Sequence, residues 1–118
     1  MNINIDSHKF NIKQVKTPKK IQDGMMNKKF DDSFNGMLFF LDSGEHCFWM
    51  KNCVINLDII FLKNNKITKI FHDCPPCKDN QKCKNYCGYG DMVLEIKGGD
   101  CRKLKIKEGN VLKKFNYY

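Results

Sequence analysis

The sequence predicts an α+β fold that is mainly β, with a small sheet of antiparallel and mixed strands, one short helix and a long cysteine-rich loop. Three observations lead to this prediction. Apolar and polar residues alternate over strand-length segments along most of the chain. One stretch near the N-terminus combines a helix start with a helix stop. Gly and Asn residues that favour tight turns separate several of the segments.

The strand-length segments are rich in β-branched and aromatic residues. The Asn64–Asn65 pair is a tight-turn signal, so the segments on either side of it should form a hairpin. The predicted strands are residues 3–5, 10–15, 37–41, 47–53, 57–62, 66–71, 92–96 and 111–115.

The predicted helix begins after Thr17, whose side chain can cap it, and Pro18 suits its first position. Gly24 can end the helix, which is therefore short. Near the C-terminus, Asp100 is expected to begin a short helical turn that runs through Leu104.

The length and composition bound the organisation of the chain. With 118 residues, of which 42% are hydrophobic and 29% charged, we expect one globular domain over residues 1–118. The sequence contains no apolar run of about 18 residues that could span a membrane. Because the N-terminal residues alternate and lack a signal-peptide core, we expect a soluble, cytoplasmic protein that is a monomer or weak dimer.

The net charge is +8, but all of the 21 basic residues except Arg102 are lysines. Specific recognition of phosphates and bases favours the forked guanidinium group of Arg. The lysines are also spread along the whole chain, which is more typical of AT-rich coding than of a binding stripe. Nucleic acid is therefore an improbable partner, although non-specific affinity is compatible with the charge.

Residues 47–62, CFWMKNCVINLDIIFL, hold the only Trp and an Asp among apolar residues. Their two halves are each strand-length, and we expect a hairpin in which Asn52 faces Asp58. Trp49 and Lys51 would then lie on the other face.

The Asp58 carboxylate should be half-buried in this hairpin, so it needs Asn52, a Lys or backbone N–H groups as partners. Two interpretations follow. Asp58, Asn52 and Lys51 could form a polar cluster beside an aromatic wall that includes Trp49. Alternatively, Asp58 is a structural residue that fixes the turn.

Four cysteines lie between residues 72 and 90, in the pattern C-x2-C-x5-C-x3-C. Their number suits a tetrahedral zinc site, but the two pairs are closely spaced and Pro75–Pro76 stiffens the loop. An intracellular location argues against permanent disulfides. From the residues alone, disulfides, a metal site and free thiols all stay open. We expect no metal or other cofactor.

The phrase FWMKN at residues 48–52, followed by LDIIF at 57–61, resembles the signature of the domain of unknown function 192 family, also described as an uncharacterised conserved ACR. Cys53, Asn56 and Asn110 depart from the family pattern. Further matches in the same order are Gly24 to Met26, Gly36 to Phe39, Pro75 to Cys77, Cys83, Tyr86, Val93 to Glu95, Gly99, Ile106 and Gly109.

The resemblance has implications for the fold and for the cysteines. The string KIKEGN at residues 105–110 is similar to a turn found in small cradle-like β-barrels, which implies such a barrel. Many relatives look secreted or lipid-anchored, and in exported relatives Cys77 and Cys83 look like a disulfide pair. Cys74 and Cys87 are additions in this chain. If they pair as well, we favour a Cys74–Cys87 bridge enclosing the Cys77–Cys83 bridge.

Three classes of function are compatible with these residues. The leading one is a ligand-binding or accessory module for an unknown small molecule, with a pocket near residues 47–62. Trp49 would supply its apolar wall. Its oriented polar groups would come from Lys51, Asn52, Asp58 and Glu95.

The second class is a hydrolase or lyase that uses Asp58 or Glu95 as a general base. The sequence lacks the common nucleophile, phosphate-loop, zinc-protease and dinucleotide motifs. The third class is a thiol-redox or zinc-binding protein that uses Cys74 to Cys87, although its C-x-x-C lacks a thioredoxin-like context. Whether the protein is an enzyme stays open.

Overall fold

The computed structural model describes residues 1–115 and confirms the mainly β, α+β prediction. The part of the chain that it describes contains two short helices, because the helical turn expected at residues 100–104 is a second helix. The elements are β1 (Asn2–Ile5), β2 (His8–Val15), α1 (Pro18–Asp23), β3 (Gly36–Phe48), β4 (Leu57–Lys63), β5 (Lys66–Cys74), β6 (Tyr86–Lys97), α2 (Asp100–Leu104) and β7 (Leu112–Phe115).

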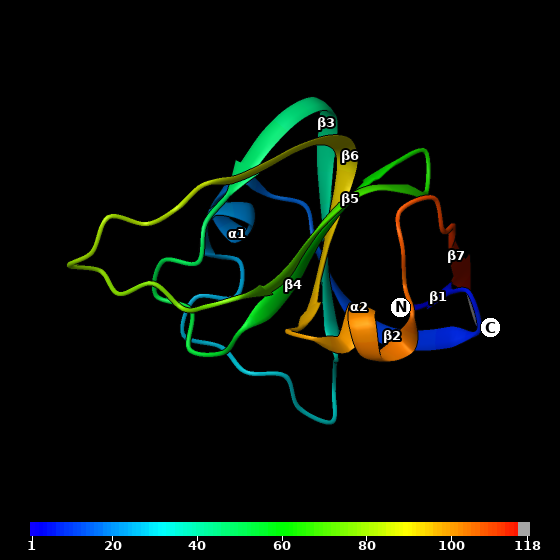
Figure 1. Ribbon diagram of the computed structural model, residues 1–118, viewed down its shortest axis with the longest axis horizontal. Helices are drawn as coiled ribbons and strands as arrows, with labels where there is room; N and C mark the ends of the chain where they lie inside the picture. The colour runs from blue at the N-terminus through cyan, green and yellow to red at the C-terminus, as the bar shows by residue number, and fades with distance from the viewer. Residues whose placement is uncertain (116–118) are drawn as a thin grey trace.

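The seven strands form one sheet in the order β5-β4-β6-β3-β2-β1-β7. Neighbouring strands are antiparallel, apart from the parallel pair β2–β3, in which Ile12 lies opposite Gly36. The sheet curls into a half-barrel, and the N-terminus lies near β1 and β7 (Figure 1). Barrel-like closure of this kind is what the sequence predicted.

Local signals in the sequence set several element ends. The side chain of Thr17 accepts a hydrogen bond from the backbone N–H of Lys20, and Gly24 ends α1 with a φ of 46°. Asn64 and Asn65 both have positive φ, 51° and 66°, as a two-residue turn between β4 and β5 requires. These predictions are confirmed.

The predicted hairpin between residues 47–53 and 57–62 is wrong. Strand β3 ends at Phe48, and β6 lies between β3 and β4 and pairs with both. Asn52 cannot continue a strand because its φ is 58°, in the left-handed region. An apolar strand distant in sequence therefore replaces the local pairing.

The cysteine-rich loop is shorter than predicted. Strand β5 continues to Cys74 and β6 begins at Tyr86, so the loop spans residues 75–85. It projects from the body of the molecule (Figure 1). Its base is held by residues 50–53, because Cys77 donates to the Met50 carbonyl at 3.0 Å and Asn52 donates to the Cys77 carbonyl at 2.8 Å.

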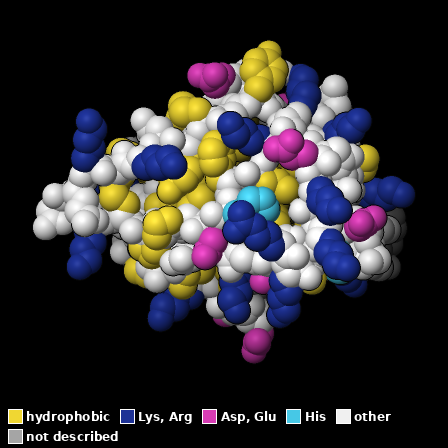
Figure 2. Space-filling model, viewed as in Figure 1, with side chains coloured by type: hydrophobic (Ala, Val, Ile, Leu, Met, Phe, Trp, Pro, Cys, Tyr) yellow, Lys and Arg dark blue, Asp and Glu magenta, His cyan; other side chains and the backbone are white. Residues whose placement is uncertain are grey.

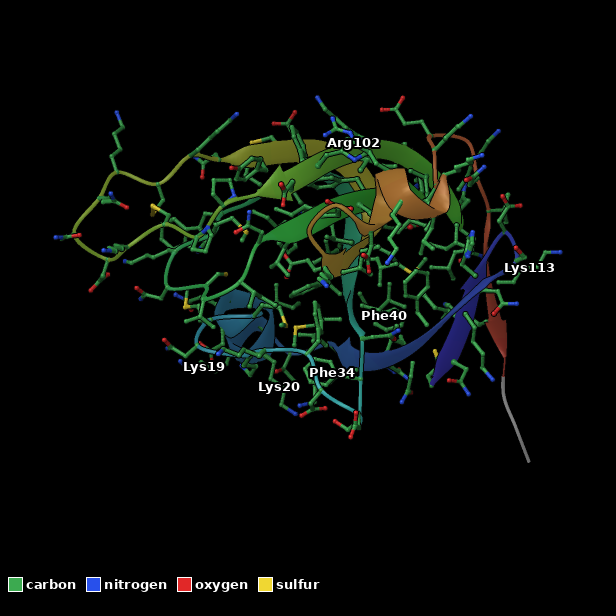
Figure 3. The ribbon with its side chains drawn as sticks, turned by 60° about the horizontal axis from the view of Figure 1, so that its bottom comes forward. Lys19, Lys20, Phe34, Phe40, Arg102 and Lys113 are labelled. Atoms are coloured by element: carbon green, nitrogen blue, oxygen red, sulfur yellow. A yellow bond between two sulfur atoms is a disulfide. The ribbon has the colours of Figure 1, made fainter. Side chains whose placement is uncertain are left out.

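The sheet has a hydrophobic core on each face, because alternate residues of the buried strands point to opposite sides. Cys101 of α2 belongs to one core, and Ile21 of α1 packs against the other. We call these the α2 face and the α1 face; the two helices lie apart in Figure 3. Buried residues on the α2 face include Leu38, Ile60, Leu62, Leu94 and Ile96, and those on the α1 face include Met37, Phe39, Leu57, Ile59, Phe61 and Val93.

Strand β6 curls closely over β4 beyond their paired residues. A Cβ atom at Gly90 would overlap the carbonyl oxygen of Leu62, and one at Gly88 would lie 2.6 Å from the Phe61 ring. Only glycine fits this approach. The end of β3, which pairs with the first half of β6, thereby folds over the α1 face, where residues 46–48 help to line a cavity.

Candidate functional site

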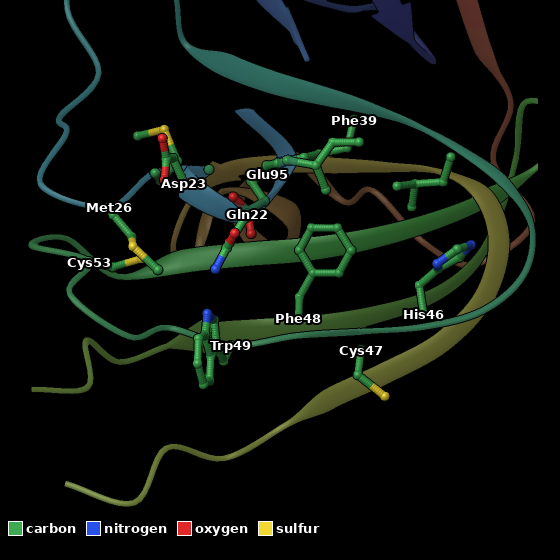
Figure 4. A pocket seen from close by; sticks show the side chains of 14 residues that line it. Gln22, Asp23, Met26, Phe39, His46, Cys47, Phe48, Trp49, Cys53 and Glu95 are labelled. Atoms are coloured by element: carbon green, nitrogen blue, oxygen red, sulfur yellow. The ribbon is translucent and has the colours of Figure 1, made fainter. Parts of the chain in front are cut away.

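A cavity of about 260 Å³ lies on the α1 face, between α1, the second half of β3, the loop after it and β6 (Figure 4). Most of its lining side chains are apolar or aromatic, with few polar groups. The lining residues are Ile21, Gln22, Asp23, Gly24, Met25, Met26, Phe39, Leu41, His46, Cys47, Phe48, Trp49, Cys53 and Glu95.

Glu95 is the buried titratable group of this cavity. Its side chain is 3% exposed, and among the described residues none donates a hydrogen bond to its carboxyl group. Burial raises its pKa from 4.5 to about 8, because no partner compensates for the loss of water. At neutral pH the group is therefore mostly protonated and can both donate and accept a hydrogen bond.

The aromatic wall is formed by Phe39, Phe48 and Trp49. Phe39 and Phe48 pack edge to face with ring centroids 5.0 Å apart, while Trp49 is 41% exposed at the end of β3. Trp49 thus lies between the cavity and solvent.

The remaining polar groups of the cavity are not poised as nucleophiles. Cys53 is buried, and burial, followed by the nearby Glu95, raises the pKa of its thiol to about 12. Nε2 of His46 lies 2.6 Å from the carbonyl oxygen of Asp42. Asp23 pairs with Lys19 at 3.2 Å, in an exposed ion pair.

The structure brings together only two of the predicted site residues, Trp49 and Glu95. The Lys51 ammonium is 3.2 Å from Asp79 in the cysteine-rich loop and 5.0 Å from the centroid of the Trp49 ring. Asn52 acts through its backbone, which accepts a hydrogen bond from Asn27 at 2.9 Å. Lys51 and Asn52 therefore hold loops together around the site and do not line the cavity.

Asp58 lies on the opposite face of the sheet. It is fully buried and accepts hydrogen bonds from the backbone N–H groups of Asp73 at 2.7 Å, Gly99 at 2.9 Å and Cys101 at 2.8 Å. The expected cluster of Asp58 with Asn52 and Lys51 does not form, because the hairpin behind that expectation is absent. Of the two interpretations of Asp58, the geometry matches the structural one.

The structure contains two disulfides, Cys77–Cys83 and Cys47–Cys87. The expected Cys74–Cys87 bridge is wrong, because Cys87 lies directly across the β3–β6 pair from Cys47, with their Cα atoms 4.0 Å apart. Cys74 is free and buried on the α1 face, where burial raises the pKa of its thiol to about 11. The four cysteines do not converge, and residues 1–115 contain no cluster of His, Cys, Asp and Glu that could hold a metal.

Sequence reasoning missed most of the cavity wall, including Gln22, Asp23, Met26, Phe39, Phe48 and Cys53. A usable signal was present in the sequence. The blocks at residues 24–26, 36–39 and 93–95 were noted for the family resemblance, and each contributes to the cavity lining together with Trp49.

The fold and the cavity define the class: a small half-barrel with one buried carboxyl group in a helix-covered pocket. The chain belongs to the domain of unknown function 192 family, described as an uncharacterized ACR, whose model matches residues 1–114. This confirms the resemblance noted in the sequence. No curated protein matches the chain.

Two solved structures are similar. A protein of unknown function from Novosphingobium aromaticivorans has a TM-score of 0.81 and 28% sequence identity, covering 96% of this chain and 84% of that one. A protein from Sinorhizobium meliloti, described as a candidate transcription regulator, has a TM-score of 0.80 and 22% identity, covering 95% and 89%. At this identity the second likeness shows the fold alone. Within residues 1–115, no helix is long and apolar enough to cross a membrane.

Proposed function

We propose that the protein is a binding module for a small molecule, which enters the cavity on the α1 face and is anchored by Glu95. One observation carries the proposal: Glu95 is buried at an apolar cavity without a hydrogen-bond partner among residues 1–115. Leaving a buried polar group without a partner costs about 1–3 kcal/mol. A ligand with a complementary polar group would offset this cost.

The make-up of the cavity supports this proposal. Ligand pockets are mostly apolar and aromatic, with a few polar groups that fix the orientation of the ligand. The wall of Phe39, Phe48 and Trp49, with Glu95 as the polar group, has this composition. An engineered cavity of about 150 Å³ holds benzene, so 260 Å³ accommodates a ligand of about ten non-hydrogen atoms.

An enzymatic function has less support. A carboxyl group with a pKa of about 8 suits general acid–base catalysis, which favours Glu95 over Asp58 as a candidate base. The other cavity groups offer no activated nucleophile, since the Cys53 thiol stays protonated at neutral pH, Asp23 is paired with Lys19 and Nε2 of His46 lies against the Asp42 carbonyl. The hydrolase or lyase alternative therefore ranks below binding.

A thiol-redox or zinc-binding function ranks third. Cys77 and Cys83 are bonded to each other, and Cys74 is buried with a raised pKa. A reactive or metal-binding thiol is usually accessible and of lowered pKa. These cysteines are therefore suited to a structural role and not to redox chemistry or metal binding.

The cytoplasmic location stays a prediction, and the two disulfides argue against it, because disulfides persist mainly in oxidising compartments.

The absence of a nucleic-acid partner also stays a prediction. It is supported by the Lys and Arg side chains being scattered over the face shown in Figure 2.

The test is a thermal-shift screen of fragments with about ten non-hydrogen atoms. We expect some fragments to raise the melting temperature of the wild type but not of Glu95→Leu, which keeps the apolar wall and removes the polar anchor. Glu45→Gln, at an exposed position on β3, is the control and should respond as the wild type does. Hits that stabilise Glu95→Leu equally, or an absence of hits, would contradict the proposal.

A further inference from the structure

We infer that the cavity takes an organic cation: a small molecule that combines an aromatic or aliphatic body with an ammonium group directed at Glu95. This inference rests on the proposed function and adds the chemical class of the ligand to it.

The first argument is the charge of the lining. The chain carries 21 Lys and Arg residues and a net charge of +8, yet none of the residues that line the cavity is Lys or Arg. Two of them, Asp23 and Glu95, are acids. The lining therefore contains carboxyl groups and no Lys or Arg that could pair with an anion, so it favours a cationic ligand over carboxylates and phosphates.

The second argument is that the nearby cations already have other partners. The Lys28 ammonium donates to the Gly24 carbonyl at 3.0 Å, and the Lys19 ammonium lies 3.2 Å from Asp23. Lys51 lies 3.2 Å from Asp79. Glu95 has no such partner in the described chain, so an ammonium group brought by a ligand would be its counter-ion.

The third argument is the wall. Aromatic faces attract cations, with Trp the strongest, and a desolvated ammonium gains most from them. Phe39, Phe48 and Trp49 surround the same cavity that contains the Glu95 carboxyl group (Figure 4). The stacking of the Lys51 ammonium over Trp49 at 5.0 Å shows that this indole ring accepts a cation.

Binding of a cation would be coupled to loss of a proton. Free Glu95 has a pKa of about 8, and a neighbouring ammonium lowers the pKa of a carboxyl group. The ligand therefore binds the ionised form, and its affinity rises as pH rises through the pKa of Glu95. Between pH 7 and pH 9 the ionised fraction grows about tenfold, while an alkylammonium of pKa about 10 stays protonated.

The other buried groups on the α1 face whose pKa is shifted do not reproduce this dependence. The thiols of Cys53 and Cys74 have pKa values raised to about 12 and about 11, and burial raises the pKa of Tyr86. The remaining titratable or charged groups around the cavity are Asp23 on α1 with its partner Lys19, His46 on β3, Lys28 after α1 and Lys51 beside Trp49.

The experiment compares phenethylamine, 2-phenylethanol and phenylacetate, which share a ring and differ in charge. Dissociation constants would be measured by calorimetry or by NMR at pH 7 and pH 9. We expect phenethylamine to bind at least tenfold more tightly than 2-phenylethanol at pH 9, and phenylacetate to bind most weakly. The affinity for phenethylamine should rise about tenfold from pH 7 to pH 9.

Two variants isolate Glu95. Glu95→Gln should lose both the preference for the amine and its pH dependence while still binding 2-phenylethanol, and Glu45→Gln should behave as the wild type. The carbon-13 signal of the Glu95 carboxyl group should move to its ionised position when phenethylamine is added at pH 7.

Equal binding of the amine and the alcohol would overturn the cation inference and leave the proposed function intact. An affinity for phenethylamine that is independent of pH, or unchanged in Glu95→Gln, would also overturn the inference. Binding of none of the three compounds, together with an absence of fragment hits, would overturn the proposed function itself.

Discussion

Asp58 and Glu95 are carboxylic acids on adjacent strands of one sheet, and both are buried, but they face opposite sides of it. Asp58 accepts three backbone hydrogen bonds on the α2 face, whereas Glu95 has no partner among residues 1–115 on the α1 face. Burial alone therefore does not distinguish an acid that holds the backbone together from an acid that has no partner within the described chain. The hydrogen-bond partners do.

The difference comes from the backbone that covers each face. On the α2 face, Gly99, with a φ of 91°, and the start of α2 present free N–H groups to Asp58. On the α1 face, Glu95 meets side chains such as Phe39 and Cys53, which offer no strong donor. One acid therefore fixes α2 to β4, and the other is left without a hydrogen-bond partner among residues 1–115.

The largest change in the free energy of unfolding should come from removing the charge of Asp58. In Asp58→Asn, three N–H donors lose a charged acceptor, and the new amide NH₂ group faces one of them. We expect the free energy of unfolding to fall by about 3–5 kcal/mol. Urea denaturation measures this, with the exposed Asp42→Asn as control. A loss below about 1 kcal/mol would show that the three bonds contribute little.

The pH dependence of stability should expose the other acid. Because the pKa of Glu95 is higher in the folded protein, about 8, than its ordinary value of 4.5, the folded chain retains the proton longer. The contribution of protonated Glu95 to the free energy of unfolding is fully present below about pH 4.5 and is lost as pH rises through 8. We expect the wild type to lose about 3–4 kcal/mol between pH 5 and pH 8 relative to Glu95→Gln. Parallel pH profiles of the two proteins would contradict this.

Replacing each acid by Leu should change the free energy of unfolding in opposite directions. Glu95→Leu removes a desolvated carboxyl group without orphaning a donor, so it should raise the free energy of unfolding at pH 8 by about 1–2 kcal/mol. Asp58→Leu should lower it strongly, since three N–H groups lose their acceptor. Thermal melts of both variants test this, and destabilisation by both would remove the distinction.

The smallest effect concerns Lys51. Its ion pair with Asp79 is partly exposed, so Lys51→Met should cost only about 0.2–1 kcal/mol. The cysteine-rich loop should become easier to cleave by protease, while binding in the cavity should be unchanged. A loss of fragment binding in this variant would show that Lys51 takes part in binding, contrary to this prediction.

Local signals were readable from the sequence, and distant pairings were not. Thr17, Gly24 and the Asn64–Asn65 turn each act on their own few residues, and all were predicted correctly. The pairing of Phe48 with Tyr86 depends on a strand far along the chain, and nothing within residues 47–62 reveals it. The same holds for Cys87, whose partner is Cys47.

The candidate site followed the same rule. Glu95 and Trp49 were recognised as polar and aromatic candidates, but Asp58 was grouped with them because the local hairpin would have placed it beside Asn52. Which face a residue occupies depends on the register of β4 against β6, where Asp58 lies opposite Ile96. One residue of offset separates the two acids onto different faces.

The position of β6 has a kinetic consequence. The hairpins β1–β2 and β4–β5 join neighbouring segments and can form within microseconds, whereas β6 must find β3 across a long stretch of chain, with Gly36 opposite Ile96. Glu95 lies on β6, and two of the donors to Asp58 follow it in the chain. During folding, the hydrogen bonds that hold α2 to Asp58 and the cavity around Glu95 should therefore form together, in the slow step that inserts β6 between β3 and β4.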